Sequence, residues 1–209
     1  MGIKFVLTDI DGTLTAVDET GGMARSITEH FRDMAGPDAV PFPDKCITCS
    51  LEKYNISKEE FTQKLLADLS LHTQIRPDAA AFLKFCKNTG LHLYTATTNS
   101  KYAALLKLSL GGITEDDYSG FFGGDAFGDP LGKGSPAFFP AILQALQSDG
   151  SDVAMVGDEP EFDLYPARKA GIKTIILVDL KQKEDVCQKN GAYYVRNLNF
   201  AREIIQNAQ

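Results

Sequence analysis

The sequence predicts an α/β fold, in which a doubly wound parallel sheet carries a small inserted helical segment. Two observations lead to this fold class. Short apolar runs alternate with helical stretches along most of the chain, which is the pattern of buried parallel strands joined by helices. Residues 18–75 break the alternation, because they contain helical patterns and no good strand. We therefore expect residues 1–17 and 76–209 to form the sheet domain and residues 18–75 to form a small helical domain.

The expected strands are short, continuous and apolar, as strands covered on both faces are. They span residues 3–8, 91–97, 153–156, 174–178 and 193–195. The helices between them show apolar periodicity, and some end at a glycine. They span residues 78–88, 101–110, 136–147 and 163–170, with a final helix from Asn199. Ser135 and Pro136 suit the N-cap and the first residue of the helix at 136–147.

Two helices are expected in the inserted segment. The first, at residues 22–35, has apolar side chains at helical spacing and ends before Pro37. The second, at residues 57–70, begins at Ser57 with Glu60 three residues later, which is a capping-box pattern. Its apolar stripe predicts contact between helices rather than a binding surface. The stripe consists of Phe61, Leu65, Leu66 and Leu69.

Composition and charge exclude several classes of protein. Of 209 residues, 44% are hydrophobic and 23% are charged, as in an ordinary globular protein. The net charge of −7 argues against a general nucleic-acid or membrane-surface binder, which would show a basic stripe. Apolar runs are shorter than the ~20 residues of a membrane span, and the N-terminus does not resemble a signal peptide. We expect a cytoplasmic protein without nucleic-acid or membrane partners, and the oligomeric state is unknown from the sequence.

The four cysteines, Cys46, Cys49, Cys86 and Cys187, are expected to be thiols rather than a disulfide framework. Cys46 and Cys49 form a CxxC motif. A zinc site would need two more ligands, and neither a second CxxC nor a pair of histidines supplies them. A thioredoxin-like redox pair would follow a strand, whereas this motif follows a loop with two prolines. We interpret the pair as small apolar side chains in a loop or at a helix start.

Six polar residues are candidates for one functional site. Two carboxylates follow the first strand, a hydroxyl ends the second, and a further carboxylate follows the third. Because the carboxyl ends of parallel strands meet at one edge of the sheet, we expect these side chains to gather there. A lysine in the segment GKGS and an acidic residue in GDEPEFD complete the set. The candidates are Asp9, Asp11, Thr97, Lys133, Asp158 and Asp163.

These residue types together favour phosphoryl transfer assisted by Mg²⁺. Hard oxygen ligands without histidine or cysteine suit Mg²⁺, and the ion would relieve repulsion between neighbouring carboxylates. An aspartate can attack phosphorus and form an aspartyl-phosphate. Asp11 can protonate the leaving oxygen and later deprotonate the attacking water. Gly12 allows the sharp turn that folds Asp11 back over the site.

The chain resembles the haloacid dehalogenase superfamily in four motifs. DIDGT, which starts at Asp9, is similar to the DxDGT motif, and GDEPEFD is similar to the acidic fourth motif. Thr97 and Lys133 match the second and third motifs. The resemblance implies a Rossmann-like core of strand order 5-4-1-2-3, an inserted helical cap, Mg²⁺ and an aspartyl-phosphate intermediate. It also implies the roles of the site residues.

By this resemblance Asp9 is the nucleophile and Asp11 the general acid and base. Thr97, Thr98 and Lys133 bind the substrate phosphate. The strand pattern alone leaves open whether Thr97 or a neighbouring threonine, Thr95 or Thr98, meets the phosphate. The implied metal ligands are the Asp9 carboxylate, the Asp11 backbone carbonyl and Asp158, with Asp163 in the second shell or linked through water.

Within the superfamily, Asp11 favours hydrolysis of a phosphate ester. Dehalogenases lack an acid at this position, and the related transport ATPases carry threonine there. Phosphonate-cleaving relatives use a lysine of the cap. The lysines of the inserted segment stand in no recognisable motif, and we interpret them as surface charges. They are Lys45, Lys53, Lys58 and Lys64.

We therefore expect a Mg²⁺-dependent phosphohydrolase that acts on a small phosphorylated metabolite. One alternative is a phosphotransferase or phosphomutase with the same motifs. A second alternative is a non-catalytic regulator similar to a receiver domain. It is disfavoured because receiver domains carry their phosphorylated aspartate on the third strand and have no cap. The substrate is not readable from the sequence, and residues 36–55 are the first place to seek its determinants.

Overall fold

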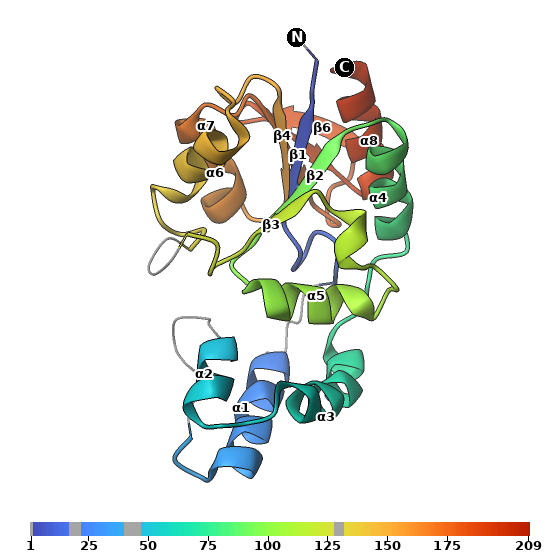
Figure 1. Ribbon diagram of the computed structural model, residues 1–209. Coiled ribbons are helices and arrows are strands. Elements are labelled where there is room, and N and C mark those ends of the chain that lie inside the picture. The colour runs from blue at the N-terminus through green and yellow to red at the C-terminus, as the bar shows by residue number, and fades with distance from the viewer. Residues whose placement is uncertain (1, 17–21, 40–46, 128–131) are drawn as a thin grey trace.

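The computed structural model describes residues 2–16, 22–39, 47–127 and 132–209. Its centre is a seven-stranded sheet of order β3-β2-β1-β4-β5-β7-β6, in which only the β6–β7 pair is antiparallel (Figure 1). The strands are β1 (Phe5–Thr8), β2 (His92–Ala96), β3 (Gly120–Phe122), β4 (Val153–Gly157), β5 (Thr174–Val178), β6 (Val186–Lys189) and β7 (Ala192–Val195). The first five strands stand in the order 5-4-1-2-3 that the resemblance implies. The predicted α/β fold class is confirmed.

Helices cover both faces of the sheet, because its central strands are apolar on both sides. Val6 packs into a cluster with α4 (Ala79–Asn88) and α8 (Leu198–Asn207), on one face. The next residue, Leu7, packs into a second cluster with α6 (Phe138–Leu146) and α7 (Tyr165–Ala170), on the other. Both side chains are fully buried. This alternation explains why the central strands read as continuous apolar runs.

Two edge strands, β3 and β6, were not predicted. β3 has three residues, all half-buried, and is too short for a recognisable apolar run. β6 is polar and largely exposed, and it pairs with β7 through the two-residue turn Asn190–Gly191. Both turn residues have positive φ, 53° and 67°, as an Asn-Gly hairpin turn requires. The Asn-Gly pair was the available signal for this hairpin.

The helix that follows Lys133 begins later than expected. α6 starts at Phe138, so the assignment of Ser135 as N-cap and Pro136 as first helical residue is wrong. The Ser135 hydroxyl instead accepts a hydrogen bond from the Ala137 N–H at 3.3 Å, which closes a local turn before the helix. The predicted helix at 163–170 is also divided, into a π-helical turn, Pro160–Leu164, and α7.

The described part of the inserted segment contains three helices, α1 (Gly22–Ala35), α2 (Ile47–Lys53) and α3 (Lys58–His72), of which α2 was not predicted. Ser57 caps α3 as expected, since its hydroxyl accepts from the Glu60 N–H at 3.3 Å. The stripe on α3 packs between helices, with Phe61 and Phe31 in edge contact at 5.2 Å. Figure 1 shows α5 (Lys101–Ser109) between these helices and the sheet.

The chain enters and leaves the inserted segment through two adjacent connectors. Thr15 and Ile75 form an isolated antiparallel bridge, and the Arg76 N–H donates to the Leu14 carbonyl at 2.9 Å. The division at 17/18 and 75/76 stays a prediction, and residues 18–21 and 40–46 lie outside the described residues.

Not all of the described cysteines are free thiols, as the sequence had predicted them to be. Cys49, in α2, is disulfide-bonded, so that expectation is wrong for this residue. Cys46 lies outside the described residues. Cys86 and Cys187 are free, and burial raises the pKa of the Cys86 thiol to about 12. Among the helices of the described chain, none has the length and apolar character to cross a membrane.

Candidate active site

Asp9 lies at the end of the central strand β1 and is almost completely buried. Its backbone N–H donates to the Val156 carbonyl at 2.9 Å, and 8% of its surface is exposed. Burial raises the pKa of Asp9 to about 6; the nearby Lys133 lowers it and Asp163 raises it further. A cationic partner beside this buried carboxylate therefore favours its ionised form.

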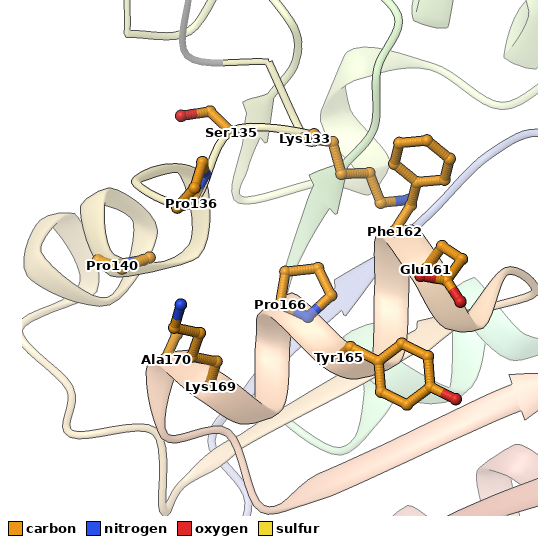
Figure 2. A pocket seen from close by; sticks show the side chains of 11 residues that line it. Lys133, Ser135, Pro136, Pro140, Glu161, Phe162, Tyr165, Pro166, Lys169 and Ala170 are labelled. Carbon is orange, nitrogen blue, oxygen red and sulfur yellow. The ribbon is translucent and has the colours of Figure 1, made fainter.

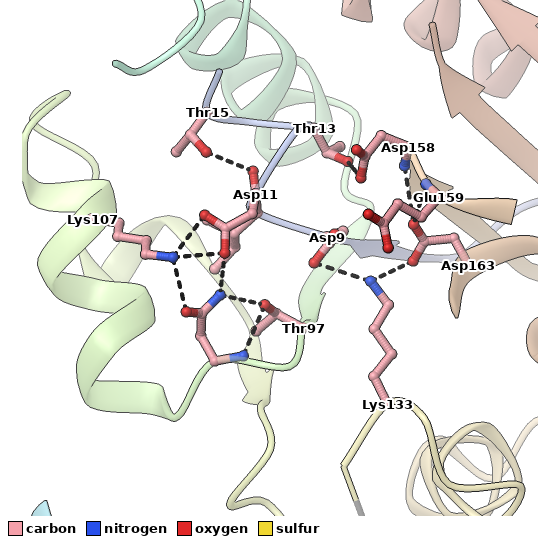
Figure 3. A network of polar contacts seen from close by, with 12 residues as sticks. Asp9, Asp11, Thr13, Thr15, Thr97, Lys107, Lys133, Asp158, Glu159 and Asp163 are labelled. Carbon is pink, nitrogen blue, oxygen red and sulfur yellow. Dashed lines mark hydrogen bonds and ion pairs between the residues drawn. The ribbon is translucent and has the colours of Figure 1, made fainter. Parts of the chain in front are cut away.

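Lys133 supplies that partner and joins two carboxylates. Its side chain is 2% exposed, and Nζ lies 3.0 Å from Asp9 Oδ1 and also contacts Asp163 Oδ1 (Figure 3). Burial lowers the pKa of Lys133, but Asp9 and Asp163 outweigh it, so the pKa lies above its usual value and the amine is charged. The other oxygen of Asp163 accepts from the backbone N–H groups of Asp158 and Glu159, each at 3.0 Å. Asp163 thus orders both Lys133 and the loop that carries Asp158.

Asp158 completes a group of three carboxylates with Asp9 and Asp163. One oxygen from each lies within 4.8 Å of the others, so the group could hold a metal ion. Burial raises the pKa of Asp158 to about 8, and the charges of Asp9 and Asp163 add to this effect. Three hard oxygen donors with one lysine leave negative charge uncompensated, and such a donor set fits Mg²⁺.

Gly12 is required where the loop after β1 passes Asp158. Its φ is +77°, and a Cβ on it would stand 2.0 Å from Asp158 Oδ2. Thr13, the next residue, donates its hydroxyl to Asp158 Oδ1 at 3.4 Å. Gly12 thus has two functions, since it supplies the predicted sharp turn and leaves room for the Asp158 carboxylate.

Asp11 belongs to a separate polar network beside this group. Its carboxylate accepts from Lys107 Nζ at 2.7 Å and 2.6 Å, one bond to each oxygen. Asn99 Nδ2 donates to Asp11 Oδ2 at 2.8 Å and to Thr97 Oγ1 at 2.9 Å (Figure 3). The structure therefore gathers three of the four predicted carboxylates in one group and places Asp11 with Thr97.

The three candidate threonines differ in their contacts. The Thr95 hydroxyl accepts from the Phe122 N–H at 3.1 Å, which ties it to strand β3. Thr97 is fully buried and accepts from both the backbone N–H and the side chain of Asn99. Thr98 is half-buried. Of the three, Thr97 is the one in the network that contains Asp11.

Sequence reasoning missed Lys107 and Asn99. A signal for Lys107 was present, because it follows Ala104 by three residues and precedes Leu108 on the buried face of α5. A lysine on an apolar stripe predicts a buried partner. Asn99 sits in a polar run, TTNS, where the sequence does not distinguish a site residue from a loop residue.

Among the described residues, two cavities lie beside residues of the site. The first, of about 350 Å³, lies between the loop that begins at Lys133 and the π-helical turn, with half-exposed Phe162 and Tyr165 on its wall (Figure 2). The second, of about 510 Å³, is lined by Gly12 and Asp158 on one side and by residues after β5 on the other. The second cavity reaches the carboxylate group at Asp158, and the first reaches Lys133.

The described lysines of the inserted segment are surface residues. Lys53, Lys58 and Lys64 are exposed, which agrees with their interpretation as surface charges. Lys58 lies 4.9 Å from the centroid of the Tyr102 ring. Lys45 lies outside the described residues.

Comparison with known proteins identifies the family. The family model described as haloacid dehalogenase-like hydrolase matches residues 3–171, which is most of the chain. The chain belongs to this family of hydrolases. No curated protein matches it.

Solved structures share the fold of this haloacid dehalogenase-like hydrolase. A HAD phosphatase from Thermococcus onnurineus is 22% identical, with a TM-score of 0.65 over 97% of this chain and 98% of that one. CbbY from Rhodobacter sphaeroides, in complex with phosphate, is 19% identical, with a TM-score of 0.62 over 94% and 95%. A 2-haloacid dehalogenase from Pseudomonas syringae pv. Tomato DC3000 is 21% identical, with a TM-score of 0.63 over 98% and 99%. Identities this low support the fold alone.

Proposed function

We propose that this hydrolase is a Mg²⁺-dependent phosphatase that cleaves a small phosphorylated metabolite through an aspartyl-phosphate intermediate. The observation that carries the proposal is the position of Asp9, buried, paired with Lys133 and grouped with Asp158 and Asp163. A second carboxylate, Asp11, stands two residues away in its own network. A nucleophile and a separate acid and base are the two groups that ester cleavage requires.

The Asp9 and Asp158 carboxylates and the Asp11 backbone carbonyl would hold the ion. Asp163 would contact these ligands or bind the ion through a water molecule. When bound, Mg²⁺ would neutralise charge on the carboxylates and on the substrate phosphate. Burial, with a smaller effect from neighbouring carboxylates, raises the pKa values of Asp9 and Asp158, and a bound cation would favour their ionised forms.

In the first half of the reaction an Asp9 oxygen attacks phosphorus and the bond from phosphorus to the ester oxygen breaks. The Lys133 ammonium and the Thr97 hydroxyl, with Thr98 beside it, would bind the phosphate oxygens and offset their charge. Asp11 gives its proton to the departing alkoxide. In the second half Asp11 takes a proton from water, which attacks the aspartyl-phosphate and releases inorganic phosphate and free Asp9.

Residues 18–75, which include helices α1–α3, are proposed to form the cap. Residues 1–17 and 76–209 are proposed to form the Rossmann-like catalytic core. The cavity lined by Gly12 and Asp158 is the proposed entrance for the substrate. Asp11 argues for turnover rather than a stable phosphoenzyme, because it supplies a base for hydrolysis. The cytoplasmic location remains part of the proposal.

A phosphate-release screen tests this function. The purified chain is assayed with Mg²⁺ against sugar phosphates, nucleotides, phosphoglycolate, flavin mononucleotide and para-nitrophenyl phosphate, with Asp9→Asn as the matched control. We expect release by the wild type and none by the variant. Transfer to an acceptor alcohol without net phosphate release would favour a phosphotransferase, and inactivity of the wild type on every ester would contradict the proposal.

A further inference from the structure

Lys107 is a buried lysine that no catalytic motif includes. It lies in α5, and its side chain is 2% exposed. A buried ammonium is costly unless its donors are all satisfied. Nζ has three N–H donors, and three acceptors surround it: both Asp11 oxygens, at 2.7 Å and 2.6 Å, and Asn99 Oδ1, at 2.9 Å. The ammonium is therefore fully satisfied by two residues of the site.

The fold holds the backbone of Lys107 in place from two sides. Its neighbour Leu106 packs into the hydrophobic cluster of the inserted helices, and Leu108 packs into the cluster of the sheet domain. Tyr102, five residues before Lys107 in α5, contacts Thr62 of α3, with 2.5 Å between the two hydroxyl oxygens. The amine thus extends from an anchored helix towards Asp11.

Asp11, in contrast, has little packing of its own. Its side chain is 48% exposed and follows a strand in a turn, so an unpaired carboxylate would sample several rotamers. Lys107 holds both of its oxygens, and Asn99 holds one of them and also Thr97 Oγ1. The Asp11 carboxylate is therefore oriented by a side chain 96 residues away in the sequence.

We propose that Lys107 is a positioning residue, which orients the Asp11 carboxylate for its work on the ester oxygen and on the attacking water. The inference rests on the proposed function, in which Asp11 is the acid and base. A reacting group displaced by about 1 Å can lose about 10²-fold in rate. We expect Lys107→Met to lower kcat for an alkyl ester by about 10- to 100-fold, with a smaller change in KM.

The test is a double-mutant cycle of Lys107→Met and Asp11→Asn, with glycerol 2-phosphate as the alkyl ester and para-nitrophenyl phosphate as the aryl ester. Because nitrophenolate leaves without a proton, the burst of nitrophenolate in Lys107→Met should stay within about threefold of the wild type. In the Asp11→Asn background, Lys107→Met should change kcat by less than about twofold, since its target is gone. A purely structural role would slow both esters and add to the loss in both backgrounds.

Lys101→Met is the matched control. Lys101 lies on the same helix, is 48% exposed and pairs with Glu115 at 2.5 Å, so its loss should leave activity within about twofold. If Lys107→Met melts below the assay temperature, the cycle is repeated with Lys107→Arg, which keeps the charge and should show a smaller loss with the same non-additivity. Full activity of Lys107→Met with glycerol 2-phosphate, or additive losses, would overturn the inference while the phosphatase stands. A wild type that is inactive on these two esters and on every ester of the screen would overturn the proposed function and this inference with it.

Discussion

Two buried lysines each meet an aspartate of the DIDGT segment, and their surroundings differ. Lys133 faces Asp9 and Asp163, with Asp158 in the same group. Lys107 faces one carboxylate, Asp11, and one neutral amide. The Asp9 side therefore has more carboxylates than lysines, whereas the Asp11 side is balanced. In the proposed mechanism, this difference favours a cation beside Asp9 and leaves the Asp11 carboxylate, though not its backbone carbonyl, outside the group of metal ligands.

The burial of the two aspartates follows the same division. The Asp9 side chain is 11% exposed and the Asp11 side chain 48%. A nucleophile for phosphorus gains from exclusion of water, because its interactions with Lys133 and a metal strengthen in a low dielectric. A group that exchanges protons with water needs access to it. Both requirements are met within three consecutive residues, because Asp9 directly follows β1, which ends at Thr8, and Asp11 lies in the turn beyond it.

Replacement of Asp9 should have the largest effect. Asp9→Asn keeps the shape of the side chain but replaces the nucleophilic carboxylate with a poorly nucleophilic amide, so we expect activity below the detection limit and an unchanged circular dichroism spectrum. Phosphate release with para-nitrophenyl phosphate measures it. Activity above a few per cent of the wild type would show that Asp9 is not the nucleophile.

The charge excess on the Asp9 side predicts dependence on a divalent metal. EDTA should abolish activity, and Mg²⁺, Mn²⁺ or Co²⁺ should restore it. Asp158→Ala should weaken metal binding, so that the Mg²⁺ concentration for half-maximal activity rises and excess Mg²⁺ partly restores the rate. Titration calorimetry with Mg²⁺ gives an independent readout. Full activity of metal-free protein in EDTA would refute the assignment of the carboxylate group.

Replacement of Asp11 should separate the two halves of the reaction. Asp11→Asn should slow attack on an alkyl phosphate by about 10²- to 10⁴-fold, the usual size of acid or base assistance. The first step with para-nitrophenyl phosphate should suffer much less, and phosphoenzyme should accumulate because its hydrolysis needs a base. Acid quench after a burst measures the trapped phosphate. Equal losses with both esters and no trapped phosphoenzyme would assign Asp11 a structural role alone.

The smallest expected effect concerns stability without metal. The pKa values of Asp9 and Asp158 are raised from 3.8 to about 6 and about 8, so above pH 4 the folded chain holds protons that the unfolded chain releases. The stability from this difference is lost as pH rises through the folded pKa values. We expect the Tm of the metal-free protein to fall between pH 5 and pH 8.

Two controls sharpen this expectation. Asp158→Asn cannot ionise, so its metal-free Tm should fall less over the same range and should exceed that of the wild type at pH 8. Saturating Mg²⁺ should raise the Tm of the wild type most at pH 8. Each 1 kcal/mol corresponds to roughly 2–4 °C in a chain of this size, which differential scanning fluorimetry resolves. A flat profile for the metal-free wild type would mean that the carboxylates are not held together without the ion.

Local patterns in the sequence were sufficient to predict the α/β fold class and the positions of the central strands. Buried parallel strands must be apolar on both faces, so the central strands could be located from single runs of residues. Asp9 and Asp158 could be placed near each other because the carboxyl ends of adjacent parallel strands meet, and their strands, β1 and β4, are adjacent. Gly12 could be expected at the turn after Asp9.

Other features depended on contacts between distant parts of the chain. The strand β3 is defined by its pairing with β2 rather than by its own composition, and the same pairing occupies Thr95 and leaves Thr97 to the site. Lys107 meets Asp11 only because α5 packs against both the inserted helices and the sheet domain. A lysine carries no local sign of which carboxylate it will meet. The sequence by itself determined the carboxylates at the ends of the strands, whereas the packing of α5 decided that Lys107 meets Asp11.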